Sequence, residues 1–82
     1  MKVILSSKAT KEYSKLPPTE RKKVKKKLVF LEQFPYSGKK LGGELSGDRD
    51  IRAWPYRIVY NINPKEKRVE VSKIQHRHGV YK

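Results

Sequence analysis

The sequence predicts a single α+β domain in which an antiparallel hairpin of two helices packs on a small antiparallel sheet. Two patterns predict this class. Apolar residues recur at helical spacing in the first half of the chain, and they alternate with polar residues from about Asp50 onward. A short apolar run at residues 3–5 predicts an N-terminal strand before the helices. We therefore expect one domain over residues 1–82, with the order strand, helix, helix and a C-terminal three-stranded meander.

The first predicted helix begins at Ser6 or Ser7, either of which can cap a helix N-terminus. Its apolar stripe, with spacings of four and three, consists of Ala9, Tyr13 and Leu16. The helix ends at Pro17 and Pro18, because proline in a helix interior removes a hydrogen bond and clashes with the preceding turn.

The second predicted helix starts at those prolines or at Thr19, since proline is tolerated in a first turn, and Pro35 stops it at about Phe34. Its buried stripe consists of Val24, Leu28 and Leu31. Lysines crowd its other faces, among them Lys22, Lys25 and Lys26. Two helices of this length are too short to fold alone, so we expect them to pack on the sheet.

The predicted meander consists of strands at residues 50–53, 56–62 and 68–75, with a turn at Trp54–Pro55. A hairpin connection at residues 63–67 has proline at a favoured turn position. In the last strand, Val69 and Val71 share one parity and Ile74 has the other. This switch predicts a β-bulge near Ser72 and Lys73.

The charge balance predicts a polyanionic partner. The chain has 21 Lys and Arg against 8 Asp and Glu, a formal net charge of +13. Nucleic acid is the first expectation, an acidic protein the second and an anionic membrane the third, and a solvated basic surface without a specific partner is the alternative. The sequence has no Cys and no apolar run near the ~18 residues that span a bilayer. We expect a cytoplasmic protein with no membrane partner, no cofactor and no metal.

Strand parity predicts which cations share one face of the sheet. If Ile58 and Tyr60 face the helices, Arg57 points to the opposite face, and the tight turn sets Arg52 beside it. Arg77 follows the last strand and could join them. Converging guanidiniums repel each other unless an anion sits among them, and their paired donors fit phosphate oxygens. The alternative for each arginine taken alone is an ordinary surface charge.

The C-terminal residues add groups that could move protons. Cleavage of RNA without a metal needs a base for the 2′-OH, cations for the phosphorane and an acid for the leaving oxygen. His76 or His78 could act as base or acid, because imidazole titrates near neutrality. Clustered arginines would favour the phenolate of Tyr81 and bring it into use. The alternatives are solvated histidines and a tyrosine ring packed on the sheet edge.

Several motifs resemble one known family. They are Lys-Leu-Pro-Pro at residues 15–18, Lys40-Leu41, Leu-Ser-Gly at 45–47, Tyr-Arg-Ile-Val-Tyr at 56–60 and the ending His-Arg-x-x-Val-Tyr at 76–81. Together they resemble the RelE/ParE superfamily of toxins from bacterial and archaeal toxin–antitoxin pairs. The resemblance covers nearly the whole chain, and the predicted order of elements is that of the superfamily.

The resemblance implies one of two activities. RelE-like members are ribosome-dependent endoribonucleases that cut mRNA in the ribosomal A site, whereas ParE-like members poison DNA gyrase. In the RelE-like pattern, the arginines that correspond to Arg57 and Arg77 bind the scissile phosphate, and the terminal tyrosine, Tyr81 here, takes part in proton transfer. The C-terminal motif favours a metal-independent mRNA interferase. A gyrase inhibitor and a plain nucleic-acid-binding module are the alternatives.

The same resemblance implies the partners, which are a 70S-type ribosome with its mRNA and a cognate antitoxin with an acidic or amphipathic segment. The residues expected to bind the RNA are Arg52, Lys22, Lys25, Lys26 and Lys73. One departure concerns the base: where RelE-like toxins often carry lysines on the strand before the Tyr-Arg motif, this chain has Asp50. Either His76, His78 or Asp50 itself is the base, or the enzyme is weak.

Overall fold

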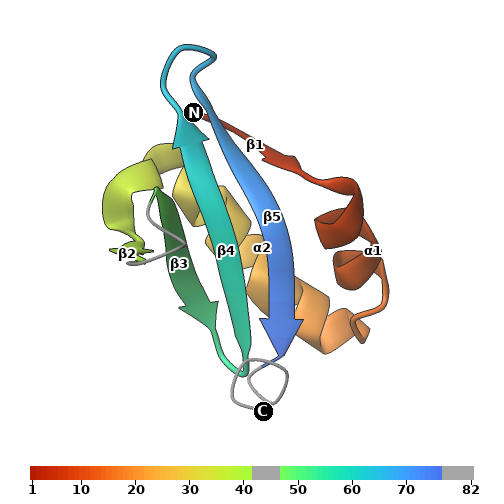
Figure 1. Ribbon diagram of the computed structural model, residues 1–82. Helices are drawn as coiled ribbons and strands as arrows, with labels where there is room; N and C mark the ends of the chain where they lie inside the picture. Colours follow the sequence, from red (N-terminus) through yellow and green to blue (C-terminus); the bar gives the residue numbers. More distant parts are fainter. Residues whose placement is uncertain (42–46, 77–82) are drawn as a thin grey trace.

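A computed structural model describes residues 1–41 and 47–76 of the chain (Figure 1). Its elements are β1 (Lys2–Leu5), α1 (Ser7–Ser14), α2 (Pro18–Gln33), the 3-10 helix η1 (Pro35–Ser37), β2 (Lys39–Lys40), β3 (Asp48–Ala53), β4 (Tyr56–Asn63) and β5 (Arg68–His76). The five strands form one sheet in the order β1-β5-β4-β3-β2. Strand β1 pairs with β5 in parallel, and the remaining pairs are antiparallel. The predicted α+β class and the order of the predicted elements are confirmed, but the sheet, which was expected to be antiparallel, is mixed because β1 runs parallel to β5.

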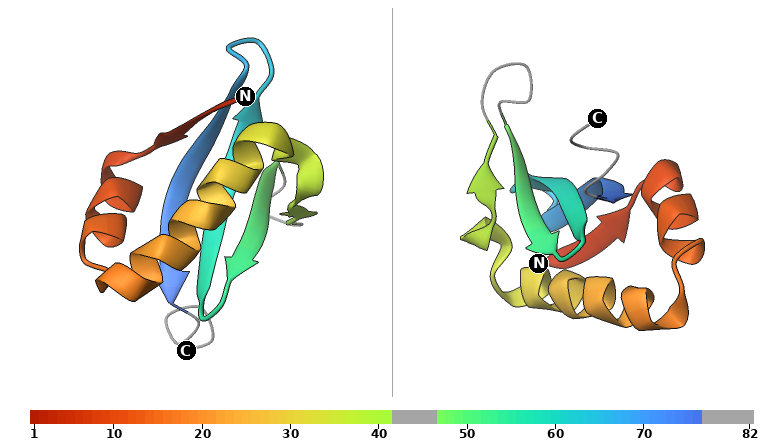
Figure 2. Two further views of the ribbon diagram at one scale, coloured as in Figure 1. Left: turned by 180° about the vertical axis from the view of Figure 1, so that it is seen from behind. Right: turned by 90° about the horizontal axis from the view of Figure 1, so that it is seen from below.

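The helices and the sheet form two layers. Both views of Figure 2 show α2 crossing one face of the sheet, while no described helix covers the opposite face. The core between the layers includes Val24 and Leu31 of α2 with Ile58 and Tyr60 of β4, all fully buried. The stripes predicted for both helices are therefore confirmed, and the other sheet face is left for polar side chains. No described helix is long and apolar enough to cross a membrane.

Helix α1 covers the part of β5 that extends beyond β1 (Figure 1). Ser6 caps α1, because its hydroxyl accepts a hydrogen bond from the Ala9 amide at 3.0 Å. The same residue bonds to β5 through its amide and hydroxyl, each at 2.9 Å, to the carbonyls of Val71 and Ser72. The Glu12 carboxylate accepts the amide of Ile74 at 2.9 Å. These bonds satisfy backbone groups that a bare strand edge would leave open.

The predicted bulge lies in β5. Val59 pairs with Lys73 and Tyr60 with Val71, so the register skips Ser72. The Ser72 hydroxyl donates to the Val59 carbonyl at 3.1 Å. The extra residue lets Val71 and Ile74 point into the same core despite their opposite parity. The turn at Trp54–Pro55 is also confirmed, and its peptide bond is cis.

The segment after α2 contains η1 and the short strand β2, neither of which is part of the predicted order of elements. Lys39 and Lys40 of β2 pair with Asp50 and Arg49 of β3. Two lysines carry no apolar pattern, so this strand exists only through its pairing with β3. The prediction of a sheet without a strand here is wrong for this physical reason.

The Tyr60 phenol fastens η1 and the start of β2 to the core. Its hydroxyl accepts the Gly38 amide and donates to the Pro35 carbonyl, both at 2.9 Å. Burial raises the pKa of Tyr60 above its ordinary value of 10.0, although the bond from Gly38 acts in the opposite direction. A Cβ at Gly38 would lie 2.2 Å from this hydroxyl oxygen, so the position requires glycine.

Candidate functional site

The helix-free face of the sheet carries the predicted arginine pair. Arg52 of β3 lies directly opposite Arg57 of β4, and Gln75 of β5 lies opposite Arg57 on its other side. This confirms the register expected from the tight turn between β3 and β4. Like charges directly opposite each other across two strands are destabilising, so the pair needs a counter-charge.

Asp50 supplies that counter-charge to Arg57. The Arg57 Nε–H donates to a carboxylate oxygen of Asp50, and the two groups form an ion pair. Asp50 is only 6% exposed. Sequence reasoning considered Asp50 as a base and missed this pair, although Asp50 shares strand parity with Arg52 and is a diagonal neighbour of Arg57.

A pocket of about 420 Å³ opens around this ion pair. Its lining comes from η1, β2, β3 and β4 and consists of Ser37, Gly38, Lys39, Leu41, Asp50, Ile51, Arg52 and Arg57. Three of these side chains are cationic and one is anionic. The pocket therefore has an excess of positive charge, which suits an anion such as a phosphate group.

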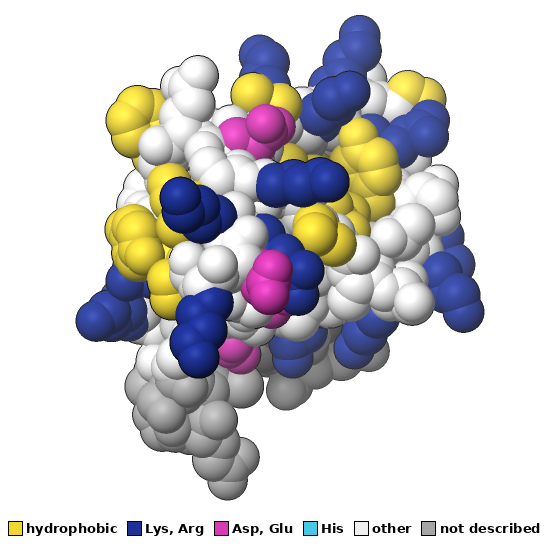
Figure 3. Space-filling model, turned by 90° about the horizontal axis from the view of Figure 1, so that it is seen from above, with side chains coloured by type: hydrophobic (Ala, Val, Ile, Leu, Met, Phe, Trp, Pro, Cys, Tyr) yellow, Lys and Arg dark blue, Asp and Glu magenta, His cyan; other side chains and the backbone are white. Residues whose placement is uncertain are grey.

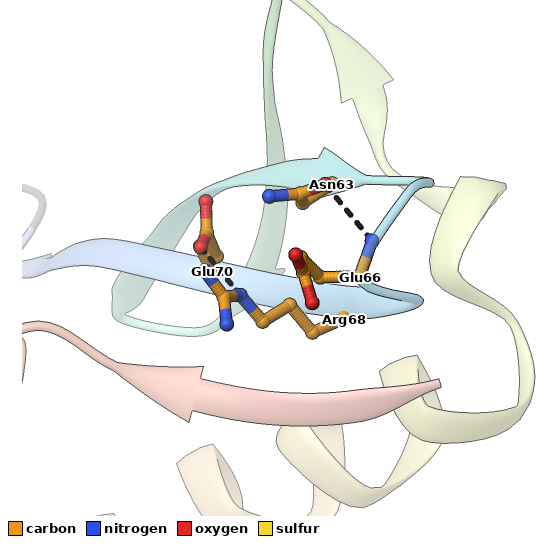
Figure 4. A network of polar contacts seen from close by, with 4 residues as sticks. All are labelled: Asn63, Glu66, Arg68 and Glu70. Atoms are coloured by element: carbon orange, nitrogen blue, oxygen red, sulfur yellow. Dashed lines mark hydrogen bonds and ion pairs between the residues drawn. The ribbon is translucent and has the colours of Figure 1, made fainter.

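Further polar residues lie on the same face along β5. Lys73 is paired with Val59, which places it on the Arg57 side of the sheet. Towards the β4–β5 turn, the Arg68 Nε–H donates to the Glu70 carboxylate at 2.7 Å, and the Asn63 side chain accepts the Glu66 amide at 3.1 Å (Figure 4). Among the described residues, this face holds two Arg–carboxylate pairs, and the Arg57 pair is the one that lines the pocket with Lys39 and Arg52.

His76 lies on the other side of the sheet from Arg57. It pairs with Tyr56, and the two rings meet edge to face with centroids 5.2 Å apart. Tyr56 packs against the core on the helix side. The structure therefore does not bring His76 together with the arginines, because its neighbour Gln75 takes the parity of the open face. Arg77, His78 and Tyr81 lie outside the described residues.

The predicted RNA-binding lysines of α2 also lie away from Arg57. Lys22, Lys25 and Lys26 are exposed on the outer side of α2, where they line a shallow pocket with Val29. Because α2 covers the opposite face of the sheet, one phosphate cannot contact both groups. Figure 3 shows one side of the molecule, on which several Lys and Arg side chains lie with fewer acidic side chains between them. Only a large polyanion could engage both faces.

Metal ligands do not gather in the described part of the chain. Among residues 1–41 and 47–76 there is no group of three or more His, Cys, Asp and Glu side chains that could hold a metal ion. The side chains that line the pocket on the helix-free face are three cations, one carboxylate, a hydroxyl and two aliphatic groups.

Comparison with known proteins identifies the family. A model of the ParE toxin of type II toxin–antitoxin systems, parDE, matches residues 3–81. The chain belongs to the RelE/ParE toxin superfamily. It is a toxin of a toxin–antitoxin system. A sequence search among curated proteins found no match.

Solved structures of this superfamily share the fold. The toxin–antitoxin complex RelBE2 from Mycobacterium tuberculosis is 28% identical, covers 92% of this chain and 95% of its own, and has a TM-score of 0.84. A mutant of the E. coli toxin RelE in complex with an antitoxin RelBc peptide is 30% identical, covers 98% and 88%, and has a TM-score of 0.77. The YoeB/ParE toxin from Agrobacterium tumefaciens, 19% identical over 93% and 98% with a TM-score of 0.81, shows the fold alone.

Proposed function

We propose that this toxin is a ribosome-dependent endoribonuclease that cleaves mRNA in the A site. The observation that carries the proposal is the cationic pocket on the helix-free face, where Arg57 and Arg52 lie side by side and Asp50 holds Arg57. The likeness to RelE structures at 28% and 30% identity supports it. The reaction takes place where translating ribosomes are, in the cytoplasm.

The chemistry is attack of a ribose 2′-OH on the adjacent phosphorus. The P–O bond to the 5′ oxygen breaks, which leaves a 2′,3′-cyclic phosphate and a 5′-OH end. Arg57, with Arg52 and Lys73 on the same face, binds and neutralises the phosphate in the phosphorane transition state. Arg77 adds a third guanidinium, and Tyr81 with His78 moves the protons. His76 has no part in this proposal, because it packs on Tyr56 on the other face.

The α2 lysines act at a distance from the reaction. In this proposal Lys22, Lys25 and Lys26 bind ribosomal RNA through its phosphates, and this binding weakens as salt rises. A cognate antitoxin with an acidic or amphipathic segment covers part of the same basic surface and keeps the toxin inactive. The solved relatives in complex with their antitoxins support this partner.

Inhibition of DNA gyrase is a second candidate. The family model that matches the chain is that of the ParE toxin, which favours this activity. In that case the basic surface serves to bind the target, and no phosphate is cleaved.

One experiment separates the two candidates. The purified toxin is added to a translating extract and new mRNA ends are mapped by primer extension, with a gyrase supercoiling assay in parallel. We expect codon-positioned ends from the wild type and about 100-fold fewer from Arg57→Gln, which keeps a donor for Asp50 but loses the charge. The matched control is Arg68→Gln, which breaks the other Arg–carboxylate pair on the same face. Supercoiling inhibition without new mRNA ends would establish the gyrase candidate instead.

A further inference from the structure

We propose that Asp50 is a positioning residue, whose carboxylate holds the Arg57 guanidinium in the orientation that binds a phosphate group of the substrate RNA. This inference rests on the proposed function and names a further residue for the same site. It assigns the carboxylate that stands where the superfamily resemblance led us to expect a lysine.

Asp50 is itself held firmly in place. It lies in β3, an interior strand, where Lys39 of β2 and Val59 of β4 are its register neighbours. Its backbone carbonyl lies so close to Gly38 that a Cβ there would approach it to 2.7 Å. With 6% of its surface exposed, the residue has little freedom to move. A side chain bonded to Asp50 is therefore bonded to a rigid part of the sheet.

Arg57 needs such an anchor more than other residues of the face. Its side chain is long, has many rotamers and is 30% exposed. Arg52 lies directly opposite and repels it, and Lys39 adds a further positive charge to the pocket. Asp50 is the one carboxylate among the described residues that line this pocket. Without it, repulsion would turn the Arg57 guanidinium towards solvent.

The geometry of the bond leaves Arg57 able to bind substrate. Asp50 engages the Nε–H, which is the inner donor of the guanidinium. The described residues provide no hydrogen-bond partner for the outer nitrogens, which carry the remaining donors. These outer donors form the fork that matches two phosphate oxygens. The carboxylate thus orients the group and occupies only the donor that a bidentate phosphate contact does not need.

The first test separates a positioning residue from a base. The asparagine of Asp50→Asn has an oxygen that can still accept the Arg57 Nε–H, but it cannot take up a proton, and Asp50→Ala can do neither. If Asp50 is a positioning residue, the single-turnover cleavage rate on programmed ribosomes should fall by about 10-fold in Asp50→Asn and by about 100-fold in Asp50→Ala. Positioning also predicts an unchanged pH profile and little change in KM. Glu70→Gln, the matched control in the other Arg–carboxylate pair, keeps the wild-type rate.

Two results would overturn the proposal in this assay. If Asp50→Asn is as inactive as Asp50→Ala and the pH dependence of the remaining rate changes, Asp50 is the base. If both variants cleave at the wild-type rate, Asp50 does not position Arg57. Circular dichroism and thermal melting of each variant identify a loss of folding, and if Asp50→Ala does not fold, the near-isosteric Asp50→Asn carries the comparison.

The second test does not depend on activity. In ¹⁵N-detected spectra the Arg57 Nε–H of the wild type should exchange slowly with water, and its signal should shift when inorganic phosphate is added. Asp50→Ala, which removes the acceptor, should exchange several-fold faster, while Glu70→Gln leaves the Arg57 signal unchanged. Equal exchange in the wild type and in Asp50→Ala would contradict the proposal. If the wild type cleaves no mRNA, the proposed function fails, and this measurement still decides whether Asp50 orients Arg57.

Discussion

Replacement of Gly38 by alanine should unfold a substantial fraction of this toxin. The added Cβ would lie 2.2 Å from the Tyr60 hydroxyl oxygen and 2.7 Å from the Asp50 carbonyl. The phenol would have to move by about 1 Å to reach ordinary van der Waals contact at 3.4 Å. Tyr60 is 0% exposed, so the surrounding core offers no space for that movement.

The magnitude follows from two costs. Overpacking of a filled core costs about 1–3 kcal/mol. Displacement of the phenol also lengthens its bonds to Gly38 and Pro35, and a buried polar group that loses its partner costs about 1–3 kcal/mol. We expect Gly38→Ala to lower the free energy of unfolding by about 2–4 kcal/mol, a large part of what a domain of this size has. The melting temperature should fall by about 10–30 °C.

The assay is a double-mutant cycle of urea or thermal unfolding with Gly38→Ala, Tyr60→Phe and both together. Tyr60→Phe removes the atom nearest to the new Cβ, so Gly38→Ala should cost at least 1 kcal/mol less in that background, on the order of the coupling between contacting residues. Part of the cost remains, because the Asp50 carbonyl and a ring carbon of Tyr60 at 2.8 Å are still close. Additivity of the two substitutions within about 0.5 kcal/mol would refute the reasoning.

Three further outcomes are expected. Burial raises the pKa of Tyr60, so the stability that its neutral phenol contributes is complete below pH 10.0 and is lost as pH rises through the raised pKa. Between about pH 8 and about pH 11, the range around the ordinary tyrosine pKa, the free energy of unfolding should therefore fall more steeply for the wild type than for Tyr60→Phe. Parallel curves of unfolding free energy against pH would exclude this cause. Glu12→Ala removes the acceptor of the Ile74 amide and should destabilise the domain by about 1–2 kcal/mol, with faster hydrogen exchange at Ile74, whereas Glu12→Gln should retain most of the protection. Replacement of the α2 lysines 22, 25 and 26 by glutamine should reduce the slope of log K against log salt for RNA binding by about 2–3 and leave stability unchanged. The control replaces three exposed lysines at the other helix, Lys8 and Lys11 of α1 and Lys15 at its C-cap. An equal reduction of the slope in that variant would show that no particular lysines bind the RNA.

Much of the fold could be predicted because its signals are local. A proline stops a helix wherever it lies, and Ser6 can accept an amide of its own helix without help from distant residues. The bulge at Ser72 was predictable because Val71 and Ile74 must both be buried and a strand can achieve this only by adding a residue. The Arg52–Arg57 pair followed from a turn too short to allow another register. His76 has the same strand parity as Ile74, which places it on the helix side. Strand parity alone therefore separates His76 from the face that carries the arginines.

The sequence by itself determined the order of the elements, the faces of the strands and the charge of the surface, since each depends on near neighbours along the chain. The tertiary structure decided which distant groups meet. Strand β2 forms only because β3 offers it backbone partners, and Tyr60 finds its partners in Pro35 and Gly38 only after the sheet has packed. It also decided that Asp50 is buried against Arg57. The residue that departs from the superfamily pattern is therefore the counter-charge of this arginine. Burial and pairing are properties of three-dimensional neighbours, and strand periodicity specifies a direction for each side chain without specifying what lies there.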